Sequence, residues 1–286
     1  MHECDFDRGT GLSVFLCGAT PDALEAELVV SFAYALEDFP SWRYLISPTS
    51  YLDPSNRPAK WMLVVAAAVT AGRYDDAIDT ADDYLLQFGE DAEIHTWAGV
   101  AHLCEGEPED ARIHLQRAAD LSPTLLTGYA EAFLVITLQA MGLGDAADAQ
   151  LRASAARCEQ SMVRAPDNRR WRFWNAFTIA LSGRYERALQ AIDGMDASLA
   201  LPPLGTLSPM FWGILGNDER LIENLDAGLA APMTMDVLLT ARPAYASNAS
   251  LKVRALTARA ARLDRVRLER ASDEAALALH LQNRAS

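Results

Sequence analysis

The chain has 286 residues, half of them apolar, and a net charge of −14. This length and composition allow one or two domains with a large core, and the acidic balance argues against nucleic-acid binding over the whole surface. Four cysteines without metal-ligand spacing indicate reduced thiols. No apolar run is long enough to span a bilayer, and the acidic N-terminus is unlike a secretory signal, so we expect a cytoplasmic protein. Only two of the 25 basic residues are lysines, which is typical of a GC-rich bacterial genome.

Residues 1–58 are predicted to form an N-terminal cap. Thr20 and Pro21 are typical of a helix start, and apolar residues recur at helical spacing from Leu24 to about Phe39. Four prolines follow between residues 40 and 58, so this segment is not a regular helix. We favour a cap that packs over the first repeat. The alternative is a tethered peptide that lies in a groove of the protein itself.

One phrase occurs twice, as "AGRYDDAI" at 71–78 and "SGRYERAL" at 182–189. Its glycine recurs at intermediate positions, each time followed by alanine five residues later, and a weaker copy lies at Gly216. Each unit of the pattern predicts an amphipathic helix, a turn with left-handed glycine, and a second amphipathic helix. The second helix of the third unit should be long and end near Arg164. Single hairpins cannot bury their apolar faces, so the hairpins should stack. The phrases should build turns and take no part in binding.

These residues resemble the tetratricopeptide repeat (TPR) family, whose period is about 34 residues. The resemblance covers residues 59–195 well and extends weakly to about 232. It implies an all-α fold, a right-handed α-solenoid of stacked helix-turn-helix hairpins with helical caps, whose first helices line a concave face that binds the ligand. The third unit departs from the pattern at Gly144. The matching residues are Trp61, Gly72, Tyr74, Ala77, Gly99, Gly106, Ala111, Leu115, Ala118, Pro123, Gly142, Ala147, Gly183, Tyr185 and Ala188.

The chain after the array is predicted to close its open end. We place the repeat array at 59–232 and C-terminal capping helices at 233–286. A long helix is expected from Asn248 to about Arg270, followed by a short one that Ser272 caps. The expected apolar stripe of the long helix is Val253, Leu256, Ala260 and Leu263.

Signals of catalysis and of metal binding are missing from the sequence. His95 and His102 are seven residues apart, whereas paired metal ligands on one helix are usually four apart. There is no phosphate-binding glycine loop and no nucleophile elbow. We therefore expect a protein that is not an enzyme and that has no cofactor and no metal site.

The register of the first helices gives candidate groove residues. Relatives of the resembled family that grip a peptide carboxylate use Lys, Asn and Arg at these positions, where this chain is mostly apolar. An apolar groove suits a helix or an extended apolar peptide; alternatively, the protein's own ends fill it and these residues are core. The candidates are Met62, Ala66, Val69, Thr96, Val100, Leu103, Tyr129, Ala132, Ile136, Arg170, Phe173 and Phe177.

Charge is unevenly distributed along the chain. Residues 74–111 contain twelve carboxylates and no Lys or Arg, whereas residues 251–270 contain seven basic and two acidic residues. We expect the two segments to lie toward opposite ends of the array. They are either solvated faces or the two halves of a salt-sensitive homo-association. Nucleic-acid and membrane partners are not expected.

The sequence therefore predicts a non-catalytic protein–protein interaction module that binds a polypeptide in its groove. One alternative is a regulatory sensor for a small molecule or a short signalling peptide. Another is an accessory subunit of an enzyme or of a secretion complex.

Overall fold

The structure, a computed structural model, describes residues 65–66, 68–70, 72–121, 127–164, 169–195, 204–245, 250–258 and 260–261. In these residues all regular structure is helical, which confirms the predicted all-α class. The predicted cap of residues 1–58 and the last predicted helix, after Ser272, lie outside the described residues.

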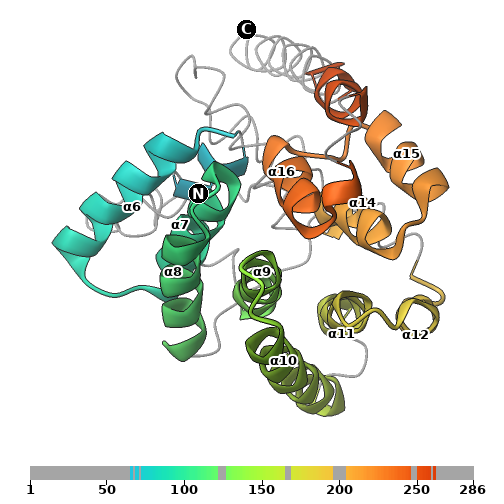
Figure 1. Ribbon diagram of the computed structural model, residues 1–286, viewed down its shortest axis with the longest axis horizontal. Coiled ribbons are helices and arrows are strands. Elements are labelled where there is room, and N and C mark those ends of the chain that lie inside the picture. Colours follow the sequence, from blue (N-terminus) through green and yellow to red (C-terminus); the bar gives the residue numbers. More distant parts are fainter. Residues whose placement is uncertain are drawn as a thin grey trace, which may run out of the picture.

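Consecutive helices pack against one another along the chain (Figure 1). Short helical stretches at 65–70 and 250–261 flank the labelled elements. The labelled helices are α6 (Tyr74–Phe88), α7 (Ala92–Glu105), α8 (Pro108–Asp120), α9 (Thr127–Ala140), α10 (Gly144–Arg164), α11 (Arg169–Leu181), α12 (Tyr185–Ala191), α14 (Leu204–Leu215), α15 (Asp218–Asp226) and α16 (Pro232–Ala241), followed by the 3-10 turn η1 (Pro243–Tyr245).

Glycine ends the first helix of each hairpin, as the repeat predicts. The five predicted turn glycines all have positive φ, between 71° and 84°. This left-handed conformation is easy for glycine because it lacks a Cβ. The fifth, Gly216, joins α14 to α15, so the weak last copy is also a hairpin. The second helix of the third hairpin was predicted to be long, and this is confirmed because α10 runs to Arg164.

The helices divide into an inner and an outer set. The outer helix α6 buries one stripe, formed by Tyr74, Ala77, Ala81 and Tyr84, and its other positions contact solvent. The inner helix α7 is buried on nearly every side, from Ile94 to Leu103. A helix with apolar residues all round must be covered on more than one face. Helix α8, the second helix of the same hairpin, covers one face of α7, and other parts of the chain cover the rest.

Helix α16 lies at the centre of the arrangement. It packs against α7, α9 and α14, which are the first helices of three different hairpins, and Figure 1 shows it enclosed between them. Its own residues Met233, Met235, Val237 and Leu238 are buried. The chain therefore curls around one of its own late helices.

The predicted apolar stripe of the C-terminal helix is wrong. Leu251 and Ala255 form its buried face, whereas Val253 is 65% exposed and Leu256 and Ala260 are also exposed. Both sets of positions have helical spacing, so spacing alone could not choose between them. The observed rotation buries Leu251 and Ala255, and it also lets Arg254 pair with Asp226 and Lys252 pair with Asp236. Leu263 lies outside the described residues.

The two charged segments do not lie at opposite ends, contrary to the prediction. Tyr74 is the first residue of the acidic segment, and its hydroxyl donates to Asp236 Oδ2 at 2.7 Å. Lys252, from the basic segment, donates through Nζ to Asp236 Oδ1 at 2.5 Å. The segments meet because α16 runs along the inner helices and returns the chain to the first hairpin.

Candidate functional site

The predicted groove residues face the interior of the molecule. Tyr129 is partly buried, whereas Met62 and the side chain of Arg170 lie outside the described residues. The remaining nine are buried, each with 7% or less of its surface exposed: Ala66, Val69, Thr96, Val100, Leu103, Ala132, Ile136, Phe173 and Phe177.

An aromatic cluster occupies the contact between α11 and α14. The ring centroids of Phe173 and Phe211 are 5.6 Å apart, and those of Phe173 and Phe177 are 5.8 Å apart. Trp174 packs edge-on against Tyr129 of α9 at 4.8 Å. Aromatic pairs at these separations stabilise a core beyond the area that they bury. Phe173 and Phe177 therefore hold consecutive hairpins together.

Two glycines allow α16 to approach the neighbouring elements closely. A Cβ on Gly213 of α14 would lie 2.5 Å from Leu238 Cδ1. A Cβ on Gly72, in the first turn, would lie 3.0 Å from Pro232 Cβ. The first separation is far below a van der Waals contact, so a side chain at Gly213 would push α16 away. The path of α16 is thus fitted to the helices around it.

Polar contacts hold α16 at its middle and at its C-terminal end. At the middle, Asp236 accepts hydrogen bonds from Tyr74 and Lys252. At its end, Arg242 donates through Nη1 to the Tyr185 hydroxyl at 2.9 Å, and its guanidinium lies 5.8 Å from the centre of the Tyr185 ring. We call Tyr74, Tyr185, Asp236, Arg242 and Lys252 the α16 clasp.

Tyr74 and Tyr185 are the tyrosines of the two repeated phrases "AGRYDDAI" and "SGRYERAL". Equivalent positions of the first and fourth hairpins thus contact one helix, Tyr74 at its middle and Tyr185 at the residue that follows its end. The phrases therefore build the turns and also contact α16, while the expectation that they take no part in binding stays a prediction. The sequence did not indicate Asp236 or Arg242, and the available signal was the tyrosine found two residues after Gly72 and again after Gly183.

The clasp side chains near Asp236 are suited to hydrogen bonding and not to acid–base chemistry. Burial raises the pKa of Tyr74 above its usual value, and the neighbouring Cys104 and Asp236 raise it further. Burial also raises the pKa of the Cys104 thiol. Both groups therefore stay protonated at neutral pH, and Tyr74 remains a hydrogen-bond donor to the Asp236 carboxylate.

A second buried polar group lies between α9 and α10. The Glu131 side chain is 3% exposed, and Arg157 Nη1 is 2.9 Å from its Oε1 in an ion pair without hydrogen-bond geometry. Burial raises the pKa of Glu131 above its ordinary value, while the charge of Arg157 opposes this. A buried carboxylate with one cation beside it costs stability when it is ionised.

No family model, no curated protein and no solved structure matches the chain. The similarity to TPR hairpins therefore rests on the repeated motif quoted above. Within the described ranges, no helix combines the length and the apolar character that crossing a membrane requires.

Proposed function

We propose that the chain is a non-catalytic protein-interaction module, a TPR-like right-handed solenoid whose inner face binds an apolar helix. One observation carries the proposal: α16 lies against the first helices α7, α9 and α14. In the resembled family these helices line the ligand-binding face. In this chain, that face holds a helix of the protein itself.

The chemistry of α16 indicates what a partner would offer. Its sequence, PMTMDVLLTA, is apolar apart from two threonines and one aspartate, and the threonine and both methionines near its start are buried. Methionine adapts to irregular surfaces, and apolar helices are commonly bound through residues three and four apart. The acidic residue and the Arg that follows the helix would fix the register through Tyr74 and Tyr185. A partner helix with the same pattern would compete with α16.

Weakening the clasp tests this proposal. In Tyr74→Phe/Tyr185→Phe both rings remain but the hydroxyls that bond to Asp236 and Arg242 are lost. Each lost hydrogen bond is worth about 1 kcal/mol, so partner binding should strengthen on the order of tenfold. Capture of partners from the native cell by the full chain, quantified by mass spectrometry, measures this. A synthetic peptide of residues 232–242 should reduce the capture.

The matched control is Tyr84→Phe, the same chemical change at the other end of α6, where the hydroxyl lies 3.4 Å from Asp91. It should behave like the wild type. The proposal is wrong if all three proteins capture the same partners to the same extent and the peptide has no effect. Substituting Phe173 or Phe177 would not serve, because both are core residues whose loss would unfold the protein.

A further inference from the structure

Three histidines lie in a row along the α7–α8 hairpin. His114 of α8 lies between His95 and His102 of α7, with ring centroids 5.0 Å and 5.2 Å away. The His102 and His114 rings are stacked, with an interplanar angle of 30°. At the other side of the row, His95 Nδ1 is 3.0 Å from His114 Nδ1, and His95 Nε2 is 3.1 Å from Glu90 Oε2. The row places imidazoles beside carboxylates at the turn that follows α7.

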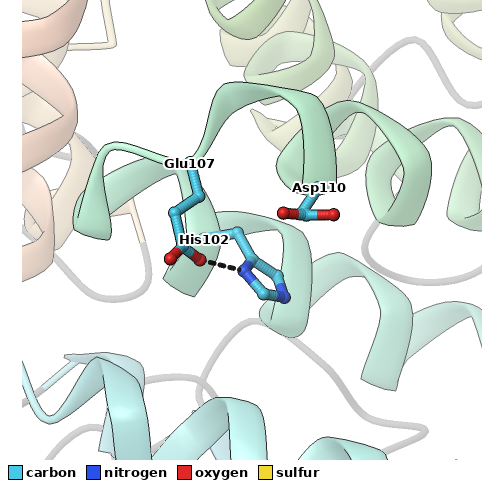
Figure 2. A group of neighbouring side chains, drawn as sticks. All are labelled: His102, Glu107 and Asp110. Atoms are coloured by element: carbon cyan, nitrogen blue, oxygen red, sulfur yellow. Dashed lines mark hydrogen bonds and ion pairs between the residues drawn. The ribbon is translucent and has the colours of Figure 1, made fainter.

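Two carboxylates lie beside His102 at this turn. Figure 2 shows Glu107 and Asp110 next to the His102 ring, with Glu107 Oε2 2.7 Å from His102 Nδ1. One possible ligand atom from each of the three residues lies within 4.8 Å of the others. The His102 side chain is only 12% exposed, whereas Glu107 is 52% exposed. The ligand nitrogen of His102 is thus held in place by packing, whereas the exposed carboxylates can change their side-chain conformations.

The backbone fixes the spacing of this group. Gly106 takes φ of 84° and its N–H bonds to the carbonyl oxygens of the last turn of α7, while Glu107 N–H donates to His102 O at 2.9 Å. Pro108 then starts α8, and Asp110 lies in its first turn. A tight glycine turn followed by proline has little conformational freedom. His102, Glu107 and Asp110 are therefore brought together before any ligand binds.

The sequence on the N-terminal side of the site is acidic, and Arg112 is the first Lys or Arg after residue 73. From residue 74 to residue 111 the chain carries twelve carboxylates and no Lys or Arg. A concentration of one sign of charge raises the local concentration of counter-ions. The acidic residues alone would attract any cation, but the imidazole of His102 selects among them, because Zn²⁺ and its neighbours prefer nitrogen ligands and Mg²⁺ and Ca²⁺ do not.

We propose that His102, Glu107 and Asp110 bind a divalent transition-metal ion of the zinc class. The protein supplies one nitrogen and two carboxylate oxygens, and water completes the coordination. A bound ion replaces the contact between His102 Nδ1 and Glu107 Oε2, since each ligand atom must offer a lone pair to the metal. His114 stacks on His102 and positions its ring. His95 and His102 are seven residues apart and do not form a ligand pair on α7; this site uses His102 with carboxylates beyond the turn.

Titration of the full chain with Zn²⁺, followed by calorimetry, tests the site. Wild-type protein should bind one ion with a saturable isotherm, and Glu107→Gln and Asp110→Asn should each weaken binding by about tenfold or more. Both positions are solvent-exposed, so the variants should stay folded, which circular dichroism checks. The control is Glu105→Gln, the same change at an exposed carboxylate two residues before Glu107. It should bind like the wild type.

Several results would overturn the proposal. The proposal is contradicted if the wild-type protein shows no saturable binding of Zn²⁺, or if the double variant Glu107→Gln/Asp110→Asn binds Zn²⁺ as well as the wild type does. Equal weakening in Glu105→Gln would mean that the acidic surface attracts Zn²⁺ without a specific site. If His114→Gln abolishes binding while Asp110→Asn does not change it, the ion lies between His95 and His114 and the assigned ligands are wrong.

Discussion

Gly99 lies in the middle of α7, where a Cβ would be 2.6 Å from Leu115 Cγ of α8. Alanine normally stabilises a helix relative to glycine by about 1 kcal/mol. Here the steric clash outweighs the helix propensity of alanine, because the Leu115 side chain that the new Cβ would meet is fully buried. We predict that Gly99→Ala lowers the free energy of unfolding by about 1–3 kcal/mol. Urea denaturation measures the change.

Gly144 is the matched position for that experiment. It begins α10, and a Cβ there would meet nothing within 4 Å. Gly144→Ala should therefore leave stability unchanged or raise it by up to about 1 kcal/mol. Equal effects of the two substitutions would contradict the close packing of α7 on α8.

Glu131 makes stability depend on pH. Its pKa is raised in the folded state, so the folded protein holds this proton more tightly than the unfolded chain does. Its contribution to stability is thus full below the ordinary glutamate pKa and is lost as the pH rises through the folded pKa. We predict that Glu131→Gln gains stability relative to the wild type as the pH rises from about 4 to about 7.

Thermal or urea unfolding of both proteins across that range measures the difference. A difference that stays constant with pH would mean that Glu131 is as well solvated in the folded protein as in the unfolded chain. If the wild type instead becomes more stable than the variant as the pH rises, the ion pair with Arg157 stabilises the ionised Glu131 more than burial destabilises it.

At the level of single elements, the C-terminal helix offers a direct comparison. Leu251 is 8% exposed and Val253 is 65% exposed, although both are apolar and lie two residues apart. We predict that Leu251→Ala lowers the free energy of unfolding by about 2–3 kcal/mol, and that Val253→Ala changes it by less than about 0.5 kcal/mol. Urea denaturation measures both changes. A larger loss for Val253→Ala than for Leu251→Ala would contradict the observed rotation and support the stripe predicted from the sequence.

The hairpins could be predicted from the sequence and the rotation of the C-terminal helix could not. Glycine at five turns has a local cause, since each position needs a left-handed backbone. The rotation depends on distant residues, because Leu251 and Ala255 are buried against other parts of the chain while Arg254 and Lys252 pair with Asp226 and Asp236 on other helices. Helical spacing within residues 250–261 carries no information about those partners.

For the whole molecule, register placed residues such as Val100, Ile136 and Phe177 on the first helices, and they are buried. That these residues bind a partner stays a prediction. The alternative from the sequence was that the protein's own ends fill the groove, and nothing in the repeat pattern pointed to α16. Its sequence is apolar on nearly every side, so it lacks the periodicity that assigns a helix to one surface.

The account stands on the position of α16 against α7, α9 and α14, and hydrogen–deuterium exchange of the full chain tests it most directly. Amides from Met235 to Ala241 should exchange far more slowly than those of an unstructured chain, because they are hydrogen-bonded within a helix whose Met235, Val237 and Leu238 are buried. Rapid exchange throughout α16, with α7 and α9 still protected, would contradict the account and would mean that the inner face is open.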